Sequence, residues 1–400
     1  MRVVLSTVGS RGEAQPVAAL ALRLQARGHQ VSVCVSPDFR DWFAGMGVPA
    51  VAVGPEMRPS ASSARWDLST PEGRVRAAED AVAAQFATLP DATRECDILV
   101  GCGAVQVAAR SVAELSGITY VHVEFCPAAL PSAHHAPAPW PGWPQDDSGS
   151  NTQLWVADAQ RWQDAWGPAL NKHRAAAGLP PVEDVRDHVL TRRPWLAADP
   201  TLSPWPGDAD VVQTGAWIMA DERPLSRELT DFLAAGAPPV YFGLGSYASA
   251  RAGGIGQVMV DAARVLGHRA IISRGWADLS LPDATDCLTI GESNHQELFG
   301  RVAAVVHHGG AGTTTAAARA GAPQVVIPQQ YDQYYWAARV DDLGIGVAHA
   351  PGMPTSESLA NALATVLQPE VARRAGSVAA AMSANDGTQV AVERLLDLCP

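Results

Sequence analysis

The chain lacks the features that would place it in a membrane or on a nucleic acid. No apolar run approaches the roughly 18 residues of a membrane-spanning helix, and the first residues lack the charged and then apolar layout of a signal peptide. The formal net charge is −12, and lysines and arginines form no dense run. Nucleic acid and anionic membranes are therefore poor candidates as partners, and we expect a cytoplasmic protein without stable membrane insertion.

Metal-binding motifs are missing as well. The six cysteines show no Cys-x-x-Cys pair or other metal-ligand spacing, and most stand in apolar, strand-like surroundings. This pattern favours small buried residues in a reducing compartment. No Asp-x-Asp element follows a predicted strand in the way that would hold a divalent cation, because Asp208-Ala209-Asp210 lies in a proline-rich connector.

What the chain does contain is typical of a globular enzyme, since 47% of its residues are hydrophobic and 18% are charged. Apolar strand-like runs alternate with helical stretches in both halves, which predicts parallel sheets covered by helices on both faces. We expect an α/β fold of two doubly wound, Rossmann-like domains facing a deep interdomain cleft, with ligands at the carboxyl ends of the strands. The predicted strands span 3–7, 31–36, 97–101, 119–123, 239–246, 270–273, 287–290, 302–306 and 324–327, and the first predicted helix spans 16–27.

A proline-rich stretch with little periodicity, 196–217, separates the two halves. Its position predicts an N-terminal domain over 1–212, a C-terminal domain over 213–380, and a last helix within 381–400 that packs back on the N-terminal domain. Eight of the twelve tryptophans lie between Trp140 and Trp217, close to an irregular segment. They could fill the core or line an apolar cleft, and the sequence favours neither interpretation.

The strongest motif follows the apolar run 302–306. That run ends in His307-His308-Gly309-Gly310-Ala311-Gly312-Thr313, and an alanine-rich helical stretch comes directly after it. A strand, a glycine turn and a helix N-terminus present free backbone N–H groups and the positive end of the helix dipole, which favours a phosphate or pyrophosphate. The loop lacks the lysine of a P-loop and the Gly-x-Gly-x-x-Gly spacing of a dinucleotide site. We expect the anion to be held by dipoles, by the hydroxyls of Thr313 and Thr314, and by His308.

Other candidate residues also follow predicted strands of the second half. Ser246 ends a Gly-x-Gly-Ser turn, Trp276 could stack on a flat base, and Asp332-Gln333 offers acceptors and an amide to a polyhydroxylated ligand. Each has a plainer interpretation, because Trp276 could simply be packed and Asp332 could cap a helix. Their shared position at strand ends is more informative than any one of them.

Glu13 lies in a second strand–glycine–helix junction, Gly9-Ser10-Arg11-Gly12-Glu13, and Pro16 is expected in the first turn of the following helix. A glutamate near a helix N-terminus is favourable because of the helix dipole alone, so a capping carboxylate is the plainer interpretation. A general base is the sharper one. Local sequence does not separate the two.

Together these motifs resemble the nucleotide-sugar signature of the metal-independent GT-B family 1 glycosyltransferases. The resemblance rests on the loop 308–313, on 319–324 and on Asp332-Gln333, while Gly9-Ser10-Arg11-Gly12 is similar to the bacterial antibiotic and sterol branch. Further stretches resemble the glycopeptide-antibiotic glycosyltransferases of the vancomycin type, and the likeness is weakest over 55–160. Those stretches are 195–200, 213–217, 221–225, 273–279 and 296–301.

The resemblance implies an inverting transfer of a sugar, usually a deoxysugar or aminodeoxysugar, from a dTDP or UDP donor to a hydroxyl of a glycopeptide-antibiotic aglycone, without cofactor or metal. It implies acceptor binding by the N-terminal domain and nucleotide-sugar binding by the C-terminal domain. Glu13 occupies the position where the antibiotic branch carries Asp as the general base, so the carboxylate is kept with one methylene more. The implied catalytic residues are Glu13 and Asp332; the implied donor-binding residues are Ser10, Arg11, Ser246, Trp276, His308, Gly309, Gly310, Gly312, Thr313, Asp332 and Gln333, with 292–294 near the base.

Other functions stay open at this point. The same chemistry could act on a sterol, a polyketide or another natural product. An NDP-sugar epimerase would need several carboxylates around the sugar, and the sequence offers only Glu13 and Asp332. A non-catalytic auxiliary protein would not need an intact glycine loop, and a dinucleotide oxidoreductase would need a fingerprint that is missing.

Overall fold

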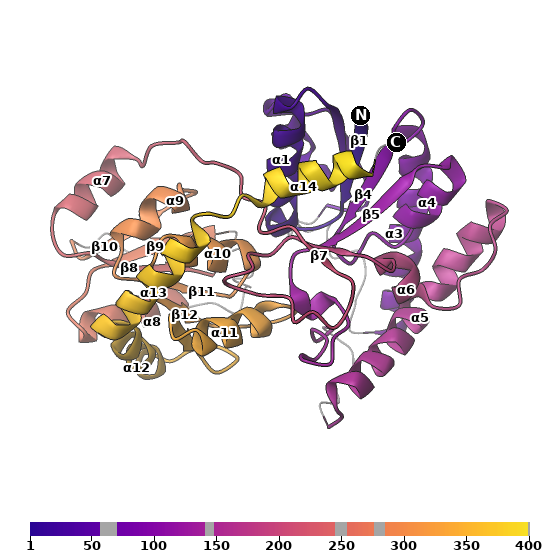
Figure 1. The fold of residues 1–400 in the computed structure, drawn as a ribbon. Coiled ribbons are helices and arrows are strands. Elements are labelled where there is room, and N and C mark those ends of the chain that lie inside the picture. The colour runs from indigo at the N-terminus through magenta and orange to yellow at the C-terminus, as the bar shows by residue number, and fades with distance from the viewer. Residues whose placement is uncertain (57–69, 141–147, 245–253, 276–284, 399–400) are drawn as a thin grey trace. The chain divides into compact units, whose positions relative to one another are not determined.

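The computed structural model describes residues 1–56, 70–140, 148–244, 254–275 and 285–398. The chain forms two compact units, each built on its own sheet (Figure 1). Unit 1 comprises Met1–Pro200, Pro204–Met219 and Asn385–Pro400, and unit 2 comprises Thr201–Ser203 and Ala220–Ala384. The prediction of an α/β fold with two parallel, doubly wound sheets is confirmed.

In the described part of unit 1, seven strands form a sheet in the order β3-β2-β1-β4-β5-β6-β7, and every neighbouring pair is parallel. The strand order reverses between β1 and β4, which is the switch point where doubly wound sheets bind ligands. Strands with helices on both faces are apolar throughout, as in the buried Val4-Leu5 pair of β1. The strands are β1 (Arg2–Thr7), β2 (Gln30–Val35), β3 (Ala50–Ala52), β4 (Ile98–Cys102), β5 (Thr119–Glu124), β6 (Trp195–Leu196) and β7 (Val212–Gln213).

Helices cover both faces of this sheet. Helices α1, α2 and α14 share a core with Leu5 and Val100, whereas α3 and α4 pack on the other face with Val4 and Leu99. The last helix, α14, lies against α1, and Arg23 of α1 pairs with Asp386 just before α14 (Figure 1). The helices are α1 (Arg11–Ala26), α2 (Pro37–Gly45), α3 (Pro71–Ala92), α4 (Ala109–Ser116), α5 (Asn151–Ala176), α6 (Val185–Leu190) and α14 (Gly387–Asp397).

Helix α1 begins earlier than the sequence predicts. It starts at Arg11, because the Ser10 hydroxyl caps it by accepting a hydrogen bond from the Gly12 N–H at 3.3 Å. The expectation that Pro16 lies in the first turn is therefore wrong, and Pro16 lies inside the helix, where it cannot donate to the Gly12 carbonyl. The predicted connector 196–217 also differs from expectation, because it contains β7 and borders β6. Strands of two residues are too short to show a hydrophobic period.

The described strands of unit 2 form a parallel sheet of six in the order β10-β9-β8-β11-β12-β13. Its two faces are both buried, with Val240 and Phe242 of β8 on one side and Tyr241 on the other. The strands are β8 (Val240–Gly243), β9 (Ala270–Ser273), β10 (Cys287–Ile290), β11 (Ala304–His307), β12 (Gln324–Val326) and β13 (Gly346–Ala348); the helices are α7 (Arg227–Ala234), α8 (Ile255–Val265), α9 (His295–Leu298), α10 (Ala311–Arg319), α11 (Gln333–Asp342), α12 (Ser356–Val366) and α13 (Pro369–Met382).

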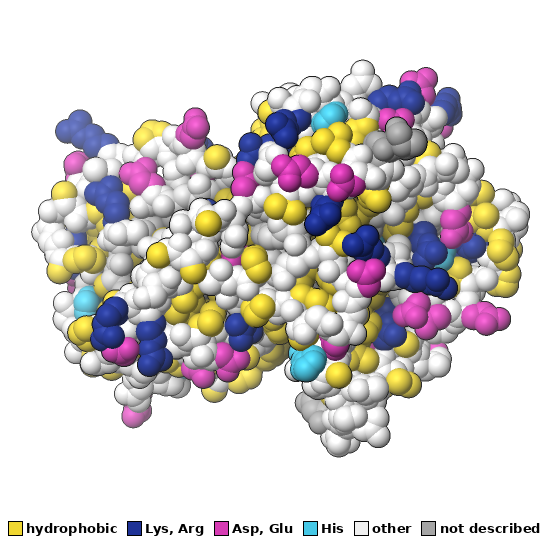
Figure 2. Space-filling view, viewed as in Figure 1, with side chains coloured by type: hydrophobic (Ala, Val, Ile, Leu, Met, Phe, Trp, Pro, Cys, Tyr) yellow, Lys and Arg dark blue, Asp and Glu magenta, His cyan; other side chains and the backbone are white. Residues whose placement is uncertain are grey.

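The surface charges and the cysteines can be compared directly with the expectations from composition. Figure 2 shows basic and acidic side chains interspersed on the face in view. In the described part of the chain, every helix is too short or too polar to cross a bilayer. Five cysteines are buried free thiols, as predicted, and Cys399 lies outside the described residues.

Candidate functional site

The loop between β11 and α10 forms an open helix N-terminus at the carboxyl edge of the unit 2 sheet. Gly310 is the N-cap of α10, and no side chain caps the helix there. The helical hydrogen bonds begin with the Thr314 N–H, which donates to the Gly310 carbonyl at 3.0 Å, so the N–H groups of the first turn have no intrahelical acceptor. Gly312 in that turn is exposed to solvent. This arrangement suits an anion.

Gly309 is the residue of this loop that only glycine can fill. Its φ is +92°, and a Cβ built on it would lie 2.7 Å from Cγ1 of Val326 and 3.1 Å from the carbonyl oxygen of Gln333. The close approach to Gln333 places the glycine loop directly against the start of α11. Folding therefore brings together two motifs that are separated in the sequence.

The two histidines before the glycines have different roles. His307 is fully buried; its Nδ1 accepts from the Gly309 N–H at 3.0 Å, so its Nε2 carries the proton and donates to Oε1 of Gln324 at 2.9 Å. Burial lowers the pKa of His307 to about 3, and that residue shapes the turn. The sequence suggested no distinct role for it.

His308 lies over the loop, where a Cβ on Gly310 would come within 2.6 Å of its Nε2. Burial lowers the pKa of His308 to about 4, against a smaller opposing effect of a hydrogen bond with the Gly243 backbone. The ring is therefore neutral near pH 7 and can give an anion an N–H dipole but not a full positive charge. Thr314 is buried and donates its hydroxyl to the Gly310 carbonyl at 3.0 Å, so its hydroxyl serves the helix.

Asp332 and Gln333 open helix α11 beside this loop. Asp332 occupies the N-cap position, but its side chain does not cap the helix; Oδ2 instead accepts from Nε1 of Trp336 at 2.9 Å. Gln333 is buried, and its Oε1 accepts from the N–H groups of Gln329 at 2.8 Å and Gln330 at 3.2 Å. The turn is tight enough to put Tyr331 at a φ of +51°. Gln333 thus builds the turn, while Trp336 orients the Asp332 carboxylate.

Part of the predicted donor site cannot be placed, because Ser246 and Trp276 lie outside the described residues. At the ends of β9 and β10 the described residues line a pocket of about 320 Å³, which includes Arg274 and Glu292. Asn294 also lines it, but its Oδ1 accepts from the N–H groups that begin α9, and its Nδ2 donates to two carbonyls of 221–223. Asn294 is therefore a structural cap. No three His, Cys, Asp or Glu side chains among the described residues gather as metal ligands would.

In unit 1, Glu13 lies in the first turn of α1 at the switch point of the sheet. Its Oε2 accepts a hydrogen bond from the hydroxyl of Thr7, the last residue of β1, at 2.9 Å. The cap of the helix is supplied by Ser10, so Glu13 is not needed for that task. The Arg11 guanidinium lies 5.6 Å from the ring centroid of Trp42.

The tryptophans of unit 1 are mostly packed. Trp155 and Trp162 of α5 are buried; Trp155 donates to the carbonyl of His135 at 2.8 Å, and Trp162 lies 5.5 Å from Trp140. For these residues the structure favours the packing interpretation over an open cleft. Trp143 lies outside the described residues.

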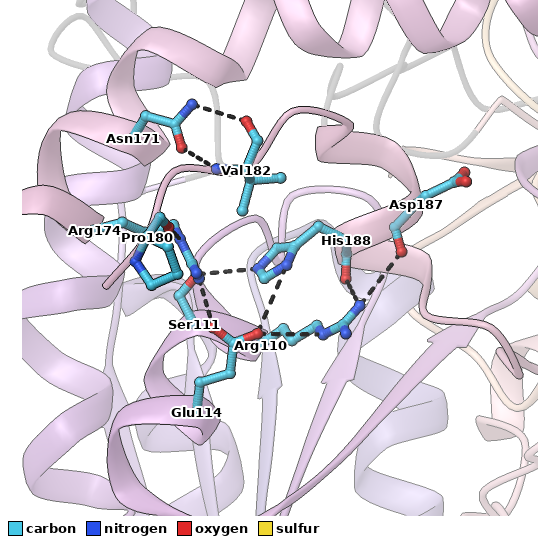
Figure 3. Close-up of polar contacts among 9 residues, drawn as sticks. All are labelled: Arg110, Ser111, Glu114, Asn171, Arg174, Pro180, Val182, Asp187 and His188. Atoms are coloured by element: carbon cyan, nitrogen blue, oxygen red, sulfur yellow. Dashed lines mark hydrogen bonds and ion pairs between the residues drawn. The ribbon is translucent and has the colours of Figure 1, made fainter. Parts of the chain in front are cut away.

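A polar cluster missed by the sequence joins α4, α5 and α6 (Figure 3). The buried guanidinium of Arg174 donates to Oγ of Ser111 and Oε2 of Glu114, each at 2.7 Å, and to the carbonyl of Pro180 at 2.8 Å. The hydroxyl of Ser111 also lies 3.1 Å from Nε2 of His188. Burial, and then the charge of Arg110, lower the pKa of His188 to about 4. The cluster joins three helices of unit 1. Its residues come from separate parts of the sequence and share no regular spacing, so no sequence pattern indicates it.

Comparison with known proteins identifies the family. Residues 3–122 match the glycosyltransferase family 28 N-terminal domain, and residues 293–398 match the erythromycin biosynthesis protein CIII-like C-terminal domain. The chain is 49% identical over 401 residues to the vancomycin aglycone glucosyltransferase of Amycolatopsis orientalis, covering 99% of this chain and 97% of that protein. The chain belongs to the vancomycin-type glycosyltransferases.

Other vancomycin-type and related glycosyltransferases agree with this assignment. The dTDP-epi-vancosaminyltransferase of the same organism is 44% identical over 386 residues, which cover 94% of this chain and 93% of that protein. Among solved structures, a glycotransferase of kitacinnamycin is similar with a TM-score of 0.76 at 20% identity, covering 100% and 99% of the two chains. The glycosyltransferase VinC in complex with dTDP has a TM-score of 0.70 at 20% identity, with the same coverage. These structures establish the GT-B fold.

Proposed function

We propose that this glycosyltransferase moves a deoxysugar or aminodeoxysugar from a dTDP or UDP donor to a hydroxyl of a glycopeptide-antibiotic aglycone, with inversion at the anomeric carbon. Support for the acceptor comes from the high identity, over nearly the whole chain, to a vancomycin aglycone glucosyltransferase. Support for a dTDP donor comes from the dTDP-epi-vancosaminyltransferase at 44% identity. Unit 2 would bind the nucleotide sugar and unit 1 the aglycone.

The proposed binding of the donor rests on one observation, the uncapped N-terminus of α10 that follows Gly309 and Gly310. Its N–H groups and the helix dipole would bind the diphosphate of the donor, with the neutral imidazole of His308 as a further hydrogen-bond donor. As the glycosidic C–O bond of the donor breaks, the diphosphate leaves with the electron pair. Fixed dipoles at that place stabilise the charge without a requirement for metal.

The acceptor half rests on Glu13. The acceptor oxygen forms the new bond to the anomeric carbon, and its proton passes to the Glu13 carboxylate. Base assistance of this kind typically contributes ~10²–10⁴-fold to the rate. Asp332, held by Trp336, would hydrogen-bond the sugar of the donor and stabilise the positive charge that develops on its ring.

One screen tests the proposed substrates. Binding of dTDP, UDP and GDP is measured by calorimetry, and the best nucleotide then selects the sugar donors for a panel of glycopeptide, polyketide and sterol aglycones. We expect dTDP to bind best and a glycopeptide aglycone to be glycosylated, with inverted stereochemistry in the product. Turnover on polyketide or sterol aglycones alone would overturn the acceptor assignment, and release of an altered sugar without acceptor would indicate an epimerase.

A further inference from the structure

A narrow, partly buried slot at the end of β1 holds the Glu13 carboxylate. Thr7 is almost completely buried, and its hydroxyl donates to Oε2 of Glu13 at 2.9 Å. On two sides the slot is closed by glycines: a Cβ on Gly9 would overlap the carboxylate, and a Cβ on Gly103 would lie 2.8 Å from Oε2. Glycine backbone therefore forms two sides of the slot, and the Thr7 side chain supplies a hydrogen-bond donor to the carboxylate.

Two of these residues belong to the β1–α1 junction, and the third follows β4. Thr7 ends β1, Gly9 lies in the turn that follows, and Gly103 comes directly after β4, with a φ of +85°. The register of the sheet pairs Thr7 with Cys102, which brings the ends of β1 and β4 side by side. The Glu13 carboxylate therefore occupies the space that a side chain at Gly9 or Gly103 would need.

Cys102 lies beside this slot, since it ends β4 directly before Gly103. Burial, then the charge of Glu13 and then that of Glu124, raise the pKa of the Cys102 thiol well above its ordinary value. The thiol stays neutral beside the carboxylate and contributes an uncharged wall. The Thr7 hydroxyl gives the carboxylate a charge-assisted hydrogen bond, which fixes the direction of Oε2.

We propose that Thr7 is the positioning residue of Glu13, an inference that rests on the proposed role of Glu13 as the base. The Thr7 hydroxyl holds Oε2 so that the carboxylate faces the acceptor hydroxyl. The slot also accounts for glutamate in place of the aspartate of the resembled branch. The side chain of an aspartate would be shorter by about one C–C bond, ~1.5 Å, and would withdraw from Thr7.

The test compares Thr7→Val, which keeps the shape of the side chain but not the hydroxyl, with Thr7→Ser, which keeps the hydroxyl. We expect Thr7→Val to lower kcat roughly ten- to a hundredfold with little change in the KM for the nucleotide sugar, and Thr7→Ser to restore most of it. The acidic limb of the kcat profile should move to higher pH in Thr7→Val, because a lost hydrogen bond to the charged form raises the pKa of a carboxylate. Thr93→Val is the matched control: Thr93 is equally buried in unit 1, but its hydroxyl donates to the Leu89 carbonyl.

A double-mutant cycle with Glu13→Gln separates positioning from general damage. If Thr7 acts through Glu13, Thr7→Val costs no further activity once Glu13→Gln is present. Equal losses in both backgrounds, or a Thr7→Ser enzyme as impaired as Thr7→Val, would overturn the positioning role. A different result tests the proposed function: a Glu13→Gln enzyme with full turnover would overturn the role of Glu13 as the base. If Thr7→Val does not fold, the Thr7→Ser enzyme still decides, because its kcat and pH profile must stay close to those of the unchanged protein.

Discussion

Two strand–glycine–helix junctions of the molecule look alike in sequence but present opposite chemistry. At the β1–α1 junction, Ser10 caps the helix and a carboxylate, Glu13, lies in the first turn. At the β11–α10 junction no side chain caps the helix and no acidic residue lies in the first turn. The first junction therefore already carries its negative charge, whereas the second leaves its N–H groups for a charge that comes from outside.

In the proposed function, one local pattern serves both halves of the reaction. Both junctions rely on glycine to let groups approach closely: Gly9 makes room for a side chain of this protein, and Gly309 makes room for its own neighbouring helix. The difference depends on the cap and on the third residue of the helix. Substitutions within the two junctions test this difference.

The largest effect is expected for Glu13→Gln. Removal of a general base should lower turnover at least about a hundredfold. Binding of dTDP, measured by calorimetry, should stay unchanged, because we propose that the diphosphate binds at the other junction. The amide keeps the size of the side chain, so the slot remains filled. Turnover within a few-fold of the unchanged enzyme would show that Glu13 only stabilises its helix.

Gly309→Ala should damage both folding and nucleotide binding. The new Cβ would meet Val326 at a φ of +92°, a strain of about 1–3 kcal/mol before any displacement of the loop. Gly312→Ala is the more specific test of nucleotide binding, because a Cβ at Gly312 would extend into open space. We expect normal thermal stability but weaker dTDP binding for Gly312→Ala, and tight binding by both variants would exclude the loop from the site.

His308→Ala should weaken binding of the nucleotide diphosphate by roughly tenfold, the loss of one hydrogen bond to a charged group. Since the pKa of His308 lies near 4, we also expect the affinity of the unchanged protein to show no step attributable to this residue between pH 6 and 8. Calorimetry over that range checks both statements. An affinity that His308→Ala leaves unaltered would remove the residue from the site.

The smallest effect on activity is expected for the α4–α5–α6 cluster in Figure 3, where the change concerns stability. The folded pKa of His188, about 4, lies below its unfolded value of 6.5, so its contribution is complete above pH 6.5 and is lost as the pH falls toward 4. Between pH 7.5 and 5 this loss is on the order of 2 kcal/mol. His188→Gln should flatten the fall in Tm on acidification. His134→Gln, at an exposed position, should not.

The sequence alone predicted the alternation of strands and helices, because buried parallel strands are continuous apolar runs and glycine turns mark their ends. It also pointed to the anion loop, since a helix N-terminus after glycines is a local feature. His308, Asp332 and Gln333 could be named in that way. Even there, local spacing did not show that Gln333 holds the turn or that His308 is neutral.

The tertiary structure decided what depends on residues distant in the chain. The pKa of His308 follows from burial, the role of Gln333 from the turn it closes, and the cluster of Arg174 and Ser111 from helices brought together by folding. Glu13 is the clearest case: its position in the sequence fits both a helix terminus, the plainer interpretation, and a base. Strand pairing places the end of β4 beside the end of β1, and this brings Gly103 against the carboxylate that Thr7 holds.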